Sequence, residues 1–126
     1  MNTMTRIGLC VLIAGYLLGC AGCGKKADTN KPITDIQAEA SKMNVEQLKA
    51  KAIEYKDAIV AKKAEIEKVT AKLKEIPITQ QMGSEAKGLQ TDIANLTKSL
   101  SSLNERFQVY YSKLKEMGGD VSGLGI

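Results

Sequence analysis

The stretch "PITQQMGSE", Pro77 to Glu85, decides the fold because it separates two runs of apolar residues that have the same spacing. Proline lacks a backbone N–H and disfavours helical geometry in the residue before it, so Pro77 is expected to end any preceding helix. Ser84 is of a type that caps helices, and we expect a second helix to begin there. Residues 77–83 are therefore predicted to form a turn between two helices.

On both sides of this turn, apolar residues recur at alternating steps of three and four. This is the heptad pattern of coiled coils, in which one apolar stripe of a helix faces another helix. It predicts helices over residues 45–76 and 84–117, and Asn44 with Gln47 makes a capping-box pattern before the first. The stripe positions are Val45, Leu48, Ala52, Tyr55, Ile59, Lys62, Ile66, Val69, Leu73 and Ile76, then Ala86, Leu89, Ile93, Leu96, Leu100, Leu103, Phe107, Tyr110, Leu114 and Met117.

The two stripes have the same length, so folding the chain back about Gln81 brings them together layer by layer. The sequence therefore predicts an all-α fold, an antiparallel two-helix coiled-coil hairpin over residues 44–117. A glycine pair at 118 and 119 is a strong helix stop, and the glycine-rich tail 118–126 is expected to be disordered. The predicted layers pair Leu73 with Leu89, Val69 with Ile93, Ile66 with Leu96, Ile59 with Leu103, and Leu48 with Leu114.

The composition excludes several classes of function. The chain has 126 residues and a formal net charge of +4, with no histidine and no tryptophan. Its basic residues are interleaved with acidic ones, so nucleic-acid binding is not expected. The sequence contains no pattern of nucleophile, general base or metal ligands, and we therefore expect neither catalysis nor a cofactor.

The amino terminus has the pattern of an export signal. Arg6 precedes a nearly unbroken apolar run, "IGLCVLIAGYLL", over residues 7–18. A membrane-spanning helix needs about 20 such residues, whereas the apolar region of a secretory signal has about 7–15. The alternative is an uncleaved N-terminal anchor.

This signal ends in "LLGC", Leu17-Leu18-Gly19-Cys20, which resembles the lipobox of bacterial lipoproteins. In that family a diacylglycerol thioether forms on the cysteine, a dedicated peptidase cuts just before it, and the new amino group is usually acylated. The resemblance implies that residues 1–19 are removed and that Cys20 anchors the mature chain through lipid such as palmitate. Cys23 is the alternative, because "CAGC" also places small residues before a cysteine. The resemblance covers only the signal region.

A lipobox implies a protein held on a bilayer in the cell envelope. In lipoproteins of enteric-type bacteria, aspartate after the anchor retains the protein in the inner membrane; here Ala21 follows. The resemblance therefore implies the outer membrane facing the periplasm, with the outer face of the inner or cytoplasmic membrane as the alternative. Residues 20–43 are expected to form a flexible tether with a short helix near Asp35 to Lys42, capped by Thr34 and Gln37.

The favoured function is a structural or protein-interaction module, with a partner protein or a second copy bound through the helices. The alternative is a periplasmic holdase or an assembly accessory for an envelope complex. Ile53 and Val60 lie on a weaker second apolar stripe, which either contacts a partner or is ordinary scattered apolar surface.

Three further residues are candidates for an interaction. Ile78 and Met82 are expected to be exposed on the turn, and the hairpin tips of periplasmic adaptor proteins, a purely architectural resemblance, often dock partners. Lys62 interrupts the stripe opposite Leu100. Its ammonium group either extends to water along an apolar stem or serves as a polar residue that selects a partner.

Overall fold

The computed structural model describes residues 27–125, so the export signal, Cys20 and Cys23 lie outside the described residues. Within that range the chain is helical and contains no strand, which confirms the predicted all-α class. The elements are α1 (Ile33–Ala40), α2 (Val45–Glu75), the 3-10 helix η1 (Ile78–Gln80) and α3 (Ser84–Glu116).

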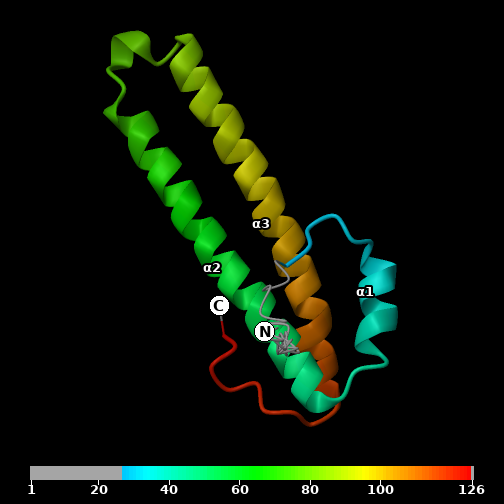
Figure 1. Ribbon diagram of the computed structural model, residues 1–126. Helices are drawn as coiled ribbons and strands as arrows, with labels where there is room; N and C mark the ends of the chain where they lie inside the picture. The colour runs from blue at the N-terminus through cyan, green and yellow to red at the C-terminus, as the bar shows by residue number, and fades with distance from the viewer. Residues whose placement is uncertain (1–26, 126) are drawn as a thin grey trace, which may run out of the picture.

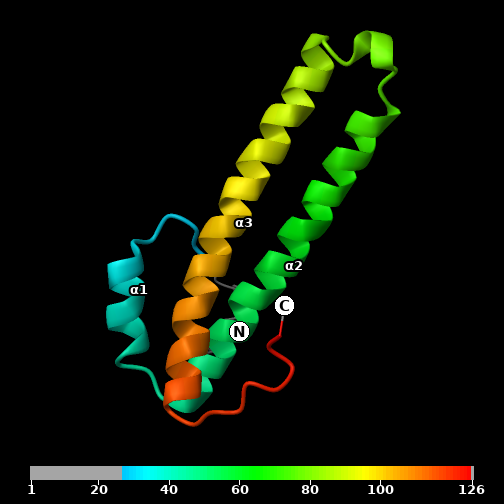
Figure 2. The same ribbon diagram turned by 180° about the vertical axis from the view of Figure 1, so that it is seen from behind.

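Helices α2 and α3 lie side by side, and the turn that contains η1 joins them at one end (Figure 1). The view from behind shows α1 beside α3 at the other end, while the tail that follows α3 passes along α2 (Figure 2). We call residues 62–100, the part that contains the turn, the tip half. The base half consists of α1, residues 45–61 and 101–116, and the tail.

The start and the end of α2 follow the local sequence. The Asn44 side chain accepts a hydrogen bond from the backbone N–H of Gln47 at 2.9 Å, and the Gln47 side chain accepts one from the backbone N–H of Asn44 at 3.1 Å. This is the predicted capping box. Helix α2 ends at Glu75, and Ile76 before Pro77 is extended, as proline requires of its predecessor.

Two other predicted caps are wrong. Helix α1 begins directly after Pro32, whose carbonyl accepts hydrogen bonds from Asp35 and Ile36, so Thr34 lies inside the first turn. No side chain caps α1. Gly83 rather than Ser84 precedes α3, and Ser84 is its first helical residue. In both places a backbone carbonyl one or two residues earlier starts the helix, so the hydroxyl is not needed as a cap.

The glycine pair ends α3 as predicted. Gly118 has a φ of 72° and donates its N–H to the carbonyl of Lys115 at 3.0 Å, while Gly119 donates to Leu114 at 2.9 Å. These two bonds form a Schellman motif. A Cβ atom on Gly119 would overlap Cδ1 of Leu114 and would lie 2.9 Å from Cγ1 of Val45. Glycine is therefore required where the chain leaves α3 and crosses the start of α2.

The hydrophobic core lies in the base half. The rings of Tyr55 and Tyr110, from α2 and α3, lie 5.4 Å apart between centroids, and those of Phe107 and Tyr111 lie 5.5 Å apart. Leu124 of the tail is 2% exposed, which differs from the disorder expected of this segment. The buried cluster consists of Ile36, Ala40, Leu48, Ala52, Tyr55, Ile59, Leu103, Phe107, Tyr110, Leu114 and Leu124.

Candidate interaction surface

A strap formed by residues 27–32 is held against the base half by Arg106 of α3. Arg106 is 7% exposed; its Nε and Nη2 donate to the carbonyl of Lys31 at 3.1 and 2.6 Å, and its Nη1 donates to the carbonyl of Ser102 at 2.9 Å. A buried cation is costly unless its donors are satisfied, and these carbonyls satisfy them. Arg106 thus fixes a segment that the sequence had suggested would be a flexible tether.

Further contacts join the strap to α1 and α2. The Tyr55 hydroxyl donates to the carbonyl of Asp28 at 3.3 Å, and the ammonium of Lys31 pairs with Glu39 of α1. This hydrogen bond to Glu39 raises the pKa of Lys31 above its usual value. Burial raises the pKa of both Tyr55 and Tyr110 above the usual value for tyrosine.

The tail packs along the other helix of the base half. Lys49 Nζ lies 2.9 Å from Oδ2 of Asp120, and Lys56 Nζ donates to the carbonyl of Gly123. Hydrogen bonds from Ser122 and Lys49 hold the pKa of Asp120 well below its usual range. In Figure 1 the tail follows the α2 side of the base while α1 occupies the α3 side. The base half is therefore covered on both sides.

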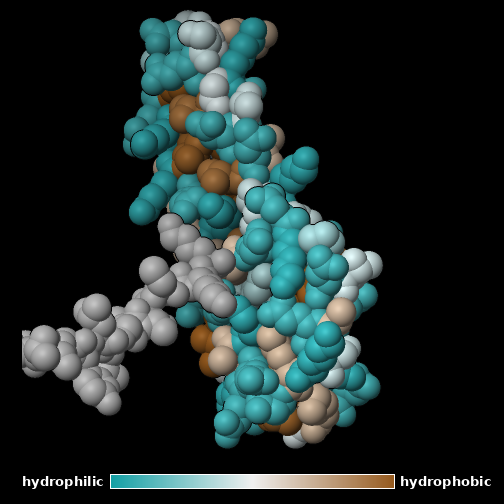
Figure 3. Space-filling model, turned by 45° about the vertical axis from the view of Figure 1, so that its right-hand side comes forward, coloured by the Kyte–Doolittle hydropathy of each residue, from teal (hydrophilic) through white to brown (hydrophobic). Residues whose placement is uncertain are grey.

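The tip half has no such cover among the residues that the structure describes. At its stripe positions the side chains of Ile66, Val69, Leu89 and Leu96 are only partly buried, whereas Leu48 and Leu114 in the base are fully buried. Figure 3 shows apolar surface along the tip half, beyond the part of the same face that α1 covers. Except at Ala86 beside the turn, which is 0% exposed, the same heptad pattern therefore makes a closed core at one end and an open apolar stripe at the other.

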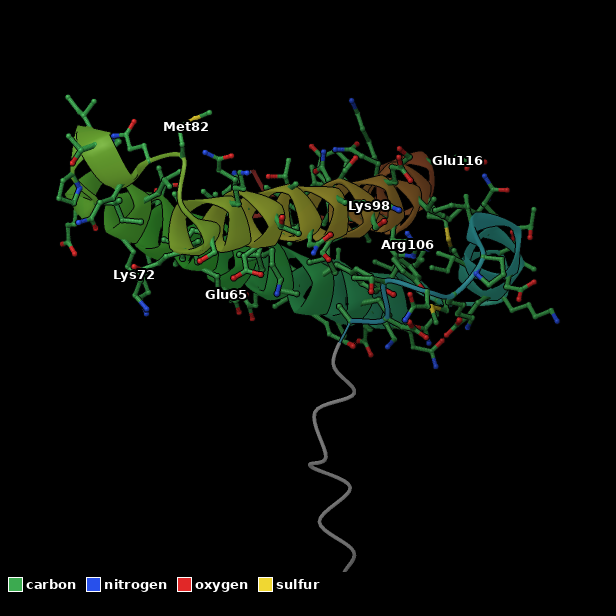
Figure 4. All side chains as sticks on the ribbon, turned by 90° about the horizontal axis from the view of Figure 1, so that it is seen from above. Glu65, Lys72, Met82, Lys98, Arg106 and Glu116 are labelled. Carbon is green, nitrogen blue, oxygen red and sulfur yellow. The ribbon has the colours of Figure 1, made fainter. Side chains whose placement is uncertain are left out.

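The interaction residues predicted from sequence are spread along the molecule rather than gathered in one cluster. Lys62 Nζ pairs with Glu65 at 2.7 Å, and the side chain of Lys62 is 24% exposed, so its stem is largely covered while its ammonium group reaches the surface. Ile53 and Val60 are 41% and 53% exposed on α2. Ile78 and Met82 are 84% and 82% exposed at the turn, where Figure 4 labels Met82.

Two grooves flank the base half. One, of about 590 Å³, runs beside the tail and has Ile59, Leu100 and Phe107 among its lining residues. The other, of about 480 Å³, lies under the strap, where its lysines pair with Glu39 and Glu54. Among residues 27–125, no three His, Cys, Asp or Glu residues are grouped to bind a metal ion.

Comparison of the chain with protein-family models, with curated proteins and with solved structures found no match. Within the described part of the chain, no helix is both long enough and apolar enough to cross a membrane. The choice of a candidate functional surface therefore depends on the structure alone. The strongest candidate is the open stripe of the tip half.

Proposed function

We propose that this protein is a lipid-anchored lipoprotein of the bacterial envelope that acts as a non-catalytic structural or protein-interaction module. Its interacting element is an antiparallel two-helix coiled-coil hairpin, the arrangement that the paired heptad stripes favour. The observation that carries the proposal is the contrast between the covered base and the open tip. An apolar stripe that no described element of its own chain covers is typical of an interaction site.

The anchor follows from the lipobox resemblance at Leu17–Cys20 and from the position of the strap. The strap begins at Ala27, and 27 − 20 gives seven residues after Cys20, a length of chain that reaches at most about 25 Å. Acylation of Cys20 would therefore hold the base near the bilayer. Two or more acyl chains make such an anchor stable, where a single chain gives only reversible binding. By the same resemblance, we favour the outer membrane facing the periplasm.

A holdase or assembly accessory is the second candidate. The observation in its favour is the exposure of Ile78 and Met82 at the turn, because methionine and other apolar side chains at a surface can adapt to many partners. A holdase would bind unfolded chains of many sequences through the turn. An interaction module would bind one partner along the tip half.

Lipid labelling tests the anchor. An alkyne analogue of palmitate should label the wild-type protein and Cys23→Ala in bacterial cells, and should fail to label Cys20→Ala, which should accumulate as the unprocessed precursor. If Cys23→Ala loses the label while Cys20→Ala keeps it, the anchor is on the other cysteine. If both variants keep the label, the lipoprotein assignment is wrong.

Photocrosslinking in the envelope tests the interaction surface. A photoreactive amino acid at Lys68 in the tip half should give discrete protein adducts. The same amino acid at Lys115, an exposed position in the base half, is the matched control and should give few. Strong adducts from Lys115 alone would contradict the proposal, and a broad smear of adducts from the tip would favour a holdase.

A further inference from the structure

We infer that the open stripe of the tip half is covered by the tip half of a second copy of this chain, which points in the same direction. In this arrangement α2 of each copy packs on α3 of the other, and the two tips form a four-helix bundle. The inference rests on the proposed interaction function and names its partner.

The size of the open stripe fits a weak dimer. Each arm of the tip half has about 15 residues, so the face is about 22 Å long and two helix diameters, or about 20 Å, wide. Two such faces bury on the order of 1,000 Å² in total, at the lower limit of specific interfaces. A symmetric pair also brings the same apolar positions into contact from both copies, as a two-fold axis requires.

The exposed charges favour the parallel direction of the two copies. When the predicted layers set the heights, Lys72 of α2 lies level with Asp92 of α3. Lys72 directly precedes the stripe residue Leu73, and Asp92 directly precedes the stripe residue Ile93, so both charges flank the stripes. Among the described residues, neither of the two makes an ion pair.

These charges are turned outward, where a second copy can meet them. Figure 4 shows Lys72 extending from α2 on the side away from α3. Placing α2 of one copy on α3 of the other brings Lys72 to Asp92 twice, once on each side of the two-fold axis. The opposite direction of packing about the centre of the tip half juxtaposes Glu65 with Asp92. Juxtaposed like charges disfavour that arrangement.

The base half limits where the second copy can lie. The strap and α1 already occupy one face of the base, and Arg106 locks the strap there. The second copy can therefore pack on this face of α2 and α3 only beyond Ala61. The base halves of the two copies then lie apart. Copies anchored through Cys20 in one leaflet would point the same way and be concentrated together, which compensates for a small interface.

A charge swap between copies tests the inference. Two full-length copies with different epitope tags are co-expressed, extracted in mild detergent and co-purified through one tag. Lys72→Glu in both copies places a carboxylate against Asp92 twice and should lower co-purification by about tenfold, as should Asp92→Lys in both copies. Mixing one Lys72→Glu copy with one Asp92→Lys copy makes both contacts attractive and should restore co-purification to near the wild-type level.

The mixed experiment separates contact between copies from contact within one chain, because an intrachain pair is not restored in trans. Lys42→Glu, a change of the same kind at an exposed position between α1 and α2, is the control and should have no effect. Helix content by circular dichroism should be unchanged in every variant. Absent wild-type co-purification, unaffected single swaps or an unrestored mixture would each overturn self-association. Retained palmitate labelling and crosslinks to another protein would in those cases leave the proposed function standing.

Discussion

The base half and the tip half share one heptad pattern but differ in how well they bury it. In the base, α1 and the tail add Ile36 and Leu124 to the stripe, and Leu48 and Leu114 are 0% exposed. In the tip, two helices alone leave Leu96 and its neighbours partly exposed. A two-helix layer buries only a narrow stripe, so a third and a fourth element are needed to close a core.

The largest expected difference in stability between the halves comes from the same substitution, leucine to alanine, at two positions of α3. Leu114→Ala removes a fully buried side chain and should lower the free energy of unfolding by about 3 kcal/mol. Leu96→Ala removes a partly exposed one and should lower it by about 1 kcal/mol in the monomer. Urea unfolding of a soluble form that begins at Ala27 measures both. Equal losses would mean that the tip is as closed as the base.

Next in size is the crossing of the tail over α2. Gly119→Ala places a methyl group against Leu114 and Val45 and should lower the free energy of unfolding by about 2 kcal/mol. Gly125→Ala is the matched control, because a Cβ atom there meets nothing within 4 Å. Thermal melts of the two variants should differ clearly. If Gly119→Ala melts with the wild type, the Schellman motif does not set the path of the tail.

Arg106→Met should detach the strap and loosen α1 while the paired helices remain folded. The side chain keeps most of its apolar stem but loses three hydrogen bonds, two of them to Lys31. The expected loss of stability is about 1–2 kcal/mol. Amide hydrogen exchange should quicken over residues 33–40 in particular. Unchanged exchange in α1 would show that Arg106 does not hold the strap.

The interruption at Lys62 should have a smaller effect, and in the opposite direction. Lys62→Leu completes a layer with Leu100 and should raise the melting temperature by a few degrees, because about 0.5–1 kcal/mol of burial is gained. The gain is modest since the lysine stem already shields part of this layer while its ammonium pairs with Glu65. Lys98→Ala, off the stripe, is the control. A lower melting temperature for Lys62→Leu would contradict the predicted layer.

The smallest expected effect is the response of the tail to acid. Hydrogen bonds from Ser122 and Lys49 lower the pKa of Asp120 from 3.8, so these contacts stabilise the fold fully above that pH and are lost as the pH falls through the lower folded value. Asp120→Asn should remove this part of the acid sensitivity. The methyl signals of Leu124 in an NMR titration report it, and identical titrations of the two proteins would rule it out.

Most of the helices could be predicted from the sequence, because the residues that start and end a helix lie next to it in the chain. The capping box at Asn44, the proline at 77 and the glycine pair lie where the structure uses them. The caps at Thr34 and Ser84 failed because a neighbouring carbonyl serves instead. The antiparallel pairing and the lipid anchor stay predictions that the proposed experiments address.

The cover of the base could not be predicted in the same way. Arg106 occupies a flanking position of its helix like many surface charges, and only the approach of the strap, 75 residues away in sequence, buries it. Leu124 stands among glycines, which indicated disorder, and its burial depends on contacts with helices far from it in sequence. The sequence contains one indication of this cover. Ile36 and Leu124 are apolar residues outside the heptads, and a small hydrophobic core can bury such residues.

Amide hydrogen exchange along α3 tests the central contrast most directly. In a dilute solution of the soluble form, amides at 103–114 should be protected to nearly the global stability, whereas those at 89–100 should exchange through local opening. In the proposed dimer the second copy covers only the tip, so raising the protein concentration should slow exchange at 89–100 and leave 103–114 unchanged. Equal protection of both segments in dilute solution would contradict the account.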